Sequence, residues 1–125
     1  MSPLEFVAVC GGGGLGAVLR FVVDGLVRER IRSPFPFGTA VINLSGSLVL
    51  GFLTGLTLAA VVTPTWALVA GTGLMGGYTT FSTASVETMR LLQTRRYALA
   101  FGNGLVVLAL TVLLGLVGFW LGSAL

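Results

Sequence analysis

The sequence contains few charged residues, no histidine, no lysine and a single cysteine. Asp, Glu, Lys and Arg together make up 9% of the 125 residues, whereas a soluble domain carries about 25%. A chain of this length with so few charges cannot cover a hydrophobic core in water. The lack of histidine and of an acidic cluster excludes a zinc or di-metal site. Because Cys10 is the only cysteine, no disulfide forms within the chain.

Hydrophobic residues, by contrast, make up 55% of the chain and fall in four long runs. Crossing the hydrocarbon of a bilayer as a helix takes roughly 20 mostly apolar residues. The sequence therefore predicts an all-α integral membrane protein that crosses the plasma membrane several times. Residues 1–125 are expected to form a single domain of four transmembrane helices, with spans at about 6–23, 38–62, 66–89 and 97–121.

The net charge of +3 comes from seven arginines and four acidic residues. Most of these arginines lie in short connections between the apolar runs, at residues 24–37 and 90–96. Membrane topology concentrates positive charge in such connections. The arginines form no patch with aromatic neighbours of the kind that binds nucleic acid, so no nucleic-acid partner is expected.

Polar residues recur on one face of the second predicted helix. Thr39, Asn43 and Ser47 are spaced by four residues, and the same face continues into Gly51 and Gly55. Polar groups at membrane depth usually face a protein interior or a water-filled path. Asn43 is the most informative, because its amide offers two N–H donors and one acceptor. The alternative is that Asn43 only forms a hydrogen bond to another helix.

The third predicted span contains the densest cluster of polar residues, in the run GGYTTFSTAS at residues 76–85. Two glycines followed by hydroxyl residues are unfavourable in a continuous helix, so we expect the helix to break between Gly77 and Thr80. A break frees backbone carbonyls at mid-membrane, and broken helices commonly bind ions there. The alternative is a continuous helix whose hydroxyls bond back to its own backbone.

Three segments together resemble the Fluc (CrcB) fluoride channels: GGLGAVLRF at residues 13–21, GTAVINLSG at 38–46 and GGYTTFSTASVE at 76–87. The resemblance covers essentially the whole chain, in order. It implies a dimer of two four-helix subunits inserted in opposite orientations, of the dual-topology type. It also implies two fluoride pores and a structural Na⁺ at the dimer interface that is not transported.

The resemblance also implies roles for individual residues. Asn43 would donate to fluoride, and Phe81 would line the path with the positive edge of its ring. The backbone carbonyls of Gly76 and Thr79 would bind Na⁺. Arg20 matches an arginine of the pore vestibule, although a lone arginine at a span end can also snorkel to the headgroups. The path is completed by hydroxyl residues, namely Thr80, Ser82, Thr83, Thr39 and, by a looser alignment, Thr111.

One residue departs from the family pattern, which places a second phenylalanine where this chain has Ala84. The missing ring removes one edge-on partner for the anion. A pore that relies on this subunit's Ala84 is therefore expected to be weak or absent.

The function that we predict is passive export of cytoplasmic fluoride through a selective channel, without enzymatic activity. An inside-negative potential drives the anion outward by about 2.3 kcal/mol per charge per 100 mV, so no energy-coupling residue is needed. A proton-coupled four-helix exporter is the first alternative, but it needs an acid at mid-membrane, and Glu5 and Glu87 lie near span ends. A non-conducting membrane subunit is the second alternative.

The distribution of arginines bears on the partner. With four spans, both termini and the turn at residues 63–65 share one side of the membrane. The other side holds six arginines against none, namely Arg28, Arg30, Arg32, Arg90, Arg95 and Arg96. Positive charge stays cytoplasmic, so a single orientation is expected, with the termini outside. A homodimer of opposed subunits needs both orientations, and we therefore favour a heterodimer with a related subunit of opposite orientation.

Overall fold

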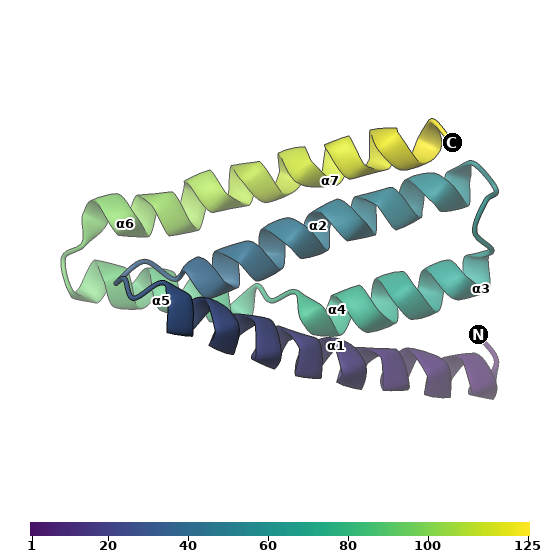
Figure 1. Ribbon diagram of the computed structural model, residues 1–125, viewed down its shortest axis with the longest axis horizontal. Coiled ribbons are helices and arrows are strands. Elements are labelled where there is room, and N and C mark those ends of the chain that lie inside the picture. Colours follow the sequence, from purple (N-terminus) through teal and green to yellow (C-terminus); the bar gives the residue numbers. More distant parts are fainter.

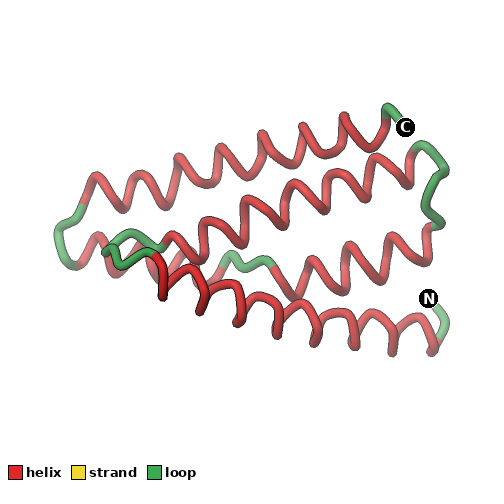
Figure 2. Tube along the Cα trace, in the orientation of Figure 1, coloured by secondary structure: helices red, strands yellow, loops and turns green.

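The computed structural model describes residues 1–125 and consists of helices joined by short turns (Figures 1 and 2). Four helical rows run alongside one another, and both chain termini lie at the same end of the molecule (Figure 1). The first two rows are α1 (Pro3–Arg30) and α2 (Phe37–Leu58). The fourth row joins α6 (Tyr97–Phe101), the π-helical stretch η2 (Gly102–Val106) and α7 (Val107–Ser123). The predicted all-α architecture with four helical segments is confirmed.

Three of the rows are long and apolar enough to cross a membrane, namely Pro3–Arg30, Phe37–Leu58 and Tyr97–Ser123. The third row is divided instead into α3 (Pro64–Ala67), the π-helical stretch η1 (Leu68–Met75), α4 (Gly76–Tyr78) and α5 (Ser82–Gln93). The chain is thus a multi-pass membrane protein. Its third helical row is divided into short segments, whereas each of the other three is a long apolar helix.

The first helix extends beyond both ends of its predicted span at residues 6–23. It starts with a capping box, in which Ser2 accepts a hydrogen bond from the Glu5 N–H and the Glu5 carboxylate accepts one from the Ser2 N–H. It continues to Arg30, and Arg28 pairs with Asp24 one turn away at 3.0 Å. The connection is therefore only residues 31–36. The end of an apolar run marks the edge of the membrane, whereas the helix continues into water.

The second helix ends at Leu58, before the predicted limit at residue 62. Ala60 takes a left-handed backbone conformation, with φ 61°. The Val61 N–H then donates back to the Leu56 carbonyl at 2.9 Å. This closure satisfies a carbonyl at the helix end, and the chain turns into α3 at Pro64.

Glycines bring the helices into backbone contact, and Gly51 and Gly55 on α2 and Gly118 and Gly122 on α7 are each spaced by four residues. A Cβ placed on Gly51 would overlap the Gly115 carbonyl oxygen, and one on Gly118 would overlap the Leu48 carbonyl oxygen. The α2–α7 pair is therefore packed through its small residues, as in close helix pairs in membranes.

A second close pair forms between α1 and the third row. Gly16 is buried, and a Cβ placed there would overlap the carbonyl oxygen of Leu74. A Cβ on Gly77 would overlap the Gly13 carbonyl oxygen in the same way. This close contact of the α1 glycines fixes α1 against the segment just before the third row leaves helical geometry.

Residues 79–81 are not helical (Figure 2), and they overlap the stretch from Gly77 to Thr80 in which the sequence predicts a break. Thr79 is extended, with φ −78° and ψ 159°. Its N–H donates to the Met75 carbonyl at 2.9 Å and is the last to donate in the α-helical pattern before the interruption. The third row therefore consists of two helical parts separated by an extended link.

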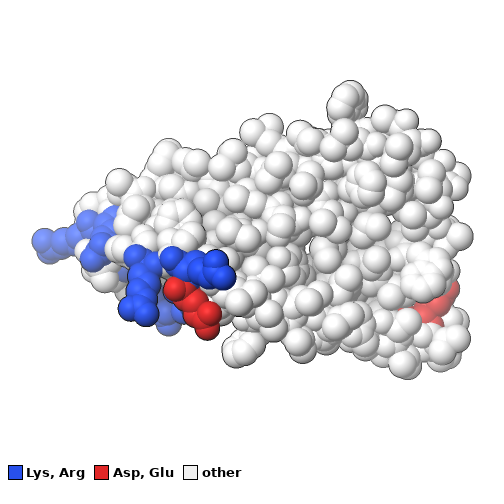
Figure 3. Space-filling model, in the orientation of Figure 1, with Lys and Arg blue, Asp and Glu red and all other residues white.

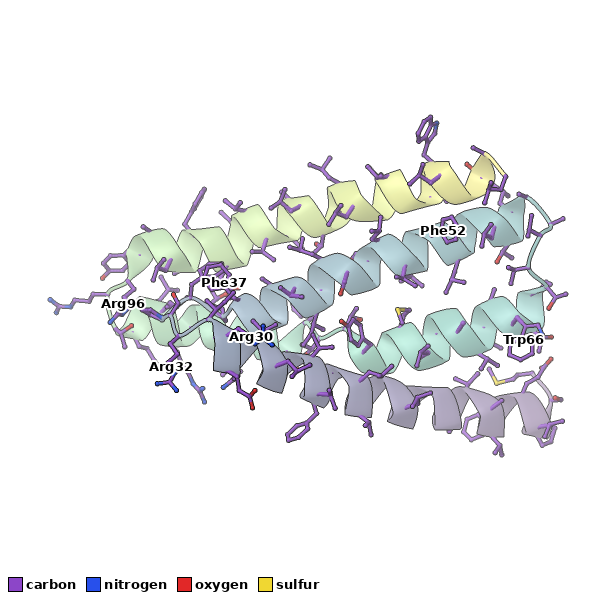
Figure 4. The ribbon with its side chains drawn as sticks, viewed as in Figure 1. Arg30, Arg32, Phe37, Phe52, Trp66 and Arg96 are labelled. Atoms are coloured by element: carbon purple, nitrogen blue, oxygen red, sulfur yellow. The ribbon has the colours of Figure 1, made fainter.

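The arginines gather at one end of the molecule, whereas acidic residues are visible at both ends (Figure 3). Arg30, Arg32, Phe37 and Arg96 lie at this end, and Trp66 lies at the other (Figure 4). We call it the arginine end. The long apolar rows between the two ends are the part that the bilayer covers.

Candidate functional site

The side chain of Asn43 on α2 forms hydrogen bonds to the non-helical segment of the third row. Its Nδ2 donates to the Thr80 carbonyl at 2.7 Å, and its Oδ1 accepts from the Thr80 N–H at 2.8 Å. One amide thus satisfies both backbone groups of a residue that has left the helix, where unpaired groups would be costly in lipid. Only one of the two Asn43 N–H donors is used in this way. The other is available to a ligand.

Thr80 in turn starts the second half of the row. It is 9% exposed, and its Oγ1 accepts from the Thr83 N–H at 3.2 Å and lies 3.4 Å from the Ser82 Oγ. The N-cap residue of α5 is Phe81, whose side chain makes no capping bond, so Thr80 satisfies this N–H of the first turn from the position before the N-cap. The Thr80 hydroxyl therefore supports the start of α5. Residues 79–81 are not part of a continuous helix, although the Thr79 hydroxyl does bond back to the Met75 carbonyl, as the alternative expects.

Arg20 reaches the interruption from α1. Its Nη1 donates to the Thr79 carbonyl at 3.3 Å, so the guanidinium points into the protein rather than toward the headgroups. The Thr79 hydroxyl donates to the Met75 carbonyl at 2.9 Å. Arg20 thus places a positive charge beside the extended link, where an anion would be attracted.

A groove of about 540 Å³ opens beside the interruption, between α2, α5 and the fourth row. It brings together Asn43, Thr79, Thr80, Phe81 and Thr111 of the predicted site. None of its lining residues carries a charge. The Phe81 ring is 79% exposed. The groove is therefore neutral, open on one side, and has amide and hydroxyl groups on its walls.

The other predicted site residues lie outside this groove. Thr39 is 3% exposed and donates to Glu87 Oε1 at 2.6 Å. Gly76, Ser82 and Thr83 are exposed beside the interruption. Thr39 lies on the Asn43 face of α2, as the sequence predicts, but its hydroxyl is held by a carboxylate toward the arginine end.

Asn103 on η2 is a polar groove residue that the sequence analysis did not single out. It is 5% exposed, and its Nδ2 donates to the Ala84 carbonyl at 3.1 Å and to the Thr88 Oγ1 at 2.8 Å. It fastens α5 to the fourth row, much as Asn43 fastens the link to α2. The signal was present, because Asn103 is an amide within a predicted span and has a glycine on each side.

The backbone at the interruption offers oxygen ligands of the kind that a hard cation such as Na⁺ takes. The Thr80 N–H would complete the helix at the Gly76 carbonyl, but it donates to Asn43 instead. The Thr79 carbonyl accepts only from Arg20, and a carbonyl oxygen has two lone pairs. The chemistry of both predicted Na⁺ ligands therefore fits the ion, although Arg20 beside Thr79 lowers the local attraction for a cation.

Comparison with known proteins gives one consistent result. The family described as CrcB-like protein, Camphor Resistance (CrcB), matches residues 7–123. A protein of Leifsonia xyli subsp. xyli, named Fluoride-specific ion channel FluC 1, is 52% identical over 125 residues, covering 98% of this chain and 90% of that one. Fluoride-specific ion channel FluC 2 of Mycolicibacterium paratuberculosis is 47% identical over 120 residues, covering 96% and 92%. FluC 1 of Listeria monocytogenes serotype 4b is 43% identical over 119 residues, covering 95% and 94%.

Proposed function

Because this chain belongs to the CrcB-like family, whose members include the fluoride-specific ion channels above, we propose that it is a passive channel that exports fluoride. It is an ion channel of the plasma membrane and not an enzyme. The observation that carries the proposal is the neutral groove at the interruption, with a free Asn43 N–H on its wall and Phe81 at its side.

The chemistry of the groove suits fluoride. Fluoride is small and tightly hydrated, so a selective path must replace water with hydrogen-bond donors. Asn43 supplies a free amide N–H and Thr80 a hydroxyl on the wall of the groove. The Asn103 amide and the Ser85 and Thr88 hydroxyls on the same walls already donate within the protein, to Ala84, Thr88 and Phe81. The edge of the Phe81 ring carries positive charge and attracts an anion without binding it strongly. No carboxylate lines the groove to repel the ion.

The function is tested by measuring fluoride efflux from liposomes that contain the purified chain. Efflux should begin when valinomycin dissipates the potential in potassium-loaded vesicles, without any proton gradient, and chloride-loaded vesicles should release no chloride. Efflux that requires a proton gradient would favour an exporter. No efflux from the chain alone would agree with the heterodimer proposed below, whereas no efflux from the chain co-expressed with a related subunit of opposite orientation would favour a non-conducting subunit.

We also propose that a structural Na⁺ binds the Gly76 and Thr79 carbonyls at a dimer interface. Purification with N-methyl-D-glucamine in place of Na⁺ should then lower fluoride efflux or dissociate the dimer, because the ion neutralises carbonyl dipoles that the broken helix leaves unpaired. Size-exclusion chromatography and efflux measured side by side provide the readout. Restoring Na⁺ should recover both, whereas full activity and an intact dimer without Na⁺ would contradict the site.

The partner proposed for this chain is a related subunit of opposite orientation. The exposed Phe81 ring and the open groove support association with a second subunit. The positive charge at one end of the molecule supports a single orientation, with the arginine end cytoplasmic (Figure 3). A heterodimer satisfies both conditions, since each chain then keeps one orientation.

We expect a C-terminal tag on this chain to be labelled from outside in nearly all intact cells, because the C-terminus lies at the end opposite the arginines (Figures 1 and 3). Labelling with a membrane-impermeant reagent before and after lysis measures the fraction. Removal of positive charge should shift this fraction, so a variant with Arg28, Arg30 and Arg32 replaced by glutamine is the control. Equal populations inside and outside, together with fluoride efflux by the pure chain, would establish a homodimer instead.

A further inference from the structure

A second hollow lies at the arginine end and shares no residue with the groove. It has a volume of about 360 Å³ and lies between the last turns of α1, the connection 31–36, the start of α2 and the last turns of α5. Because its walls come from four parts of the chain, it is a concave site rather than a row of surface side chains. Nothing in the fluoride path described above accounts for it.

Positive charge predominates on the walls of this hollow. Arg28, Arg90 and Arg96 line it, together with the acids Asp24 and Glu87. Asp24 pairs with Arg28 at 3.0 Å, which is the single ion pair of the chain, and Glu87 accepts a hydrogen bond from Thr39 at 2.6 Å. Arg90 and Arg96 therefore have no carboxylate partner. Two unpaired guanidinium groups on a concave wall are suited to a bidentate anion such as phosphate.

Apolar side chains form the rest of the hollow, namely Val27, Ile31, Phe35, Phe37 and Leu91. The rings of Phe35 and Phe37 pack with their centroids 4.9 Å apart. Ser33 and Thr94 add hydroxyl groups near the arginines. A free inorganic ion would leave this apolar surface uncovered, whereas an amphiphile would contact both kinds of wall.

The position along the helices also indicates an amphiphile. The hollow lies where the apolar rows give way to charged residues, which is the depth of the lipid headgroups. We propose that it binds the phosphate headgroup of an anionic phospholipid. Arg90 and Arg96 bind the phosphate, and Phe35, Phe37 and Ile31 contact the glycerol and upper acyl chains. Basic pockets between helices on the cytoplasmic side are suited to such headgroups.

The proposal is tested by native mass spectrometry of the detergent-solubilised protein, with dioleoyl phosphatidylglycerol or dioleoyl phosphatidylcholine added at equal concentration. The wild-type chain should retain phosphatidylglycerol and release phosphatidylcholine. The double variant Arg90→Gln, Arg96→Gln should retain at least fivefold less phosphatidylglycerol. The double variant Arg30→Gln, Arg32→Gln is the matched control, because it removes the same charge from the same end but outside the hollow. It should retain phosphatidylglycerol within twofold of wild type.

Each of the following outcomes would overturn the proposal. Equal loss in both double variants would show diffuse attraction to surface charge, and equal retention of the two lipids would show no headgroup selection. Displacement of phosphatidylglycerol by inorganic phosphate, but not by chloride at matched ionic strength, would show a site for free phosphate. If the double variant fails to fold, the two single variants Arg96→Gln, inside the hollow, and Arg32→Gln, outside it, make the same comparison. Equal retention of phosphatidylglycerol by these two variants would likewise overturn the proposal. The result does not depend on fluoride conduction.

Discussion

Replacing Phe81 with isoleucine is expected to cut fluoride flux by well over tenfold, while the protein still folds and assembles. A tenfold loss corresponds to about 1.4 kcal/mol of added barrier. The expected loss follows from the chemistry of the side chain, because isoleucine has no positive ring edge to offer the anion. The fold should survive because the ring is 79% exposed in the subunit and supports no core contact. Efflux from liposomes gives the rate, and size-exclusion chromatography reports assembly.

Phe6→Ile is the matched control for this substitution. Phe6 is also a largely exposed ring, at 60%, but it lies near the start of α1 and outside the groove. Its replacement should leave efflux unchanged. Wild-type efflux in both Phe81→Ile and Asn43→Leu would remove the pore from this groove, since the two changes take away the ring edge and the free amide donor.

Gly16→Ala is expected to lower the free energy of unfolding by about 1–3 kcal/mol, the usual cost of an extra methyl group in a packed interior. The added Cβ would overlap the carbonyl oxygen of Leu74 and approach the Tyr78 N–H. These are backbone atoms, so the clash cannot be relieved by rotating a side chain. Thermal unfolding in detergent, followed by circular dichroism, measures the effect. Fluoride efflux should fall with it, because the displaced segment leads directly into the interruption.

Gly25→Ala provides the comparison on the same helix. A Cβ on Gly25 would have no atom within 4 Å, and alanine favours a helix over glycine by up to about 1 kcal/mol. This variant should therefore be as stable as wild type or slightly more stable. Equal unfolding temperatures for the Gly16 and Gly25 variants would show that α1 and the third row are not in the close contact described above.

Much of the architecture is readable from the sequence because the bilayer restricts the choices. Apolar runs of sufficient length must be helices in lipid, and glycines spaced by four residues place a small surface on one helix face. The polar site is readable for the same reason, since Asn43 and the run around Thr80 must find partners at membrane depth. The structure joins them directly, by two hydrogen bonds between the Asn43 amide and the Thr80 backbone.

Helix ends and individual pairings were less accessible to sequence reasoning. The end of α2 depends on the left-handed backbone at Ala60. Alanine rarely adopts this conformation, so its sequence position gives no sign of it. The last turns of α1, up to Arg30, consist of residues that lie in water beyond the apolar run. A hydrophobicity pattern marks the end of the apolar run and does not show that the helix continues past it. The bond from Arg20 to Thr79 spans 59 positions of the chain. It depends on the close contact between the α1 backbone at Gly16 and the third row at Leu74. The sequence alone does not show which segments are in contact there.

The locked amide of Asn43 has a consequence for the speed of ion passage under the proposed function. Two hydrogen bonds to Thr80 fix its side-chain torsions before any ion arrives. The conformational entropy cost of orienting the remaining N–H is thus paid once, during folding, and not each time an ion binds. A preorganised donor need not reorient when the ion enters or leaves. Such a site binds each fluoride without a slow rearrangement, as a conducting pore requires and a carrier does not.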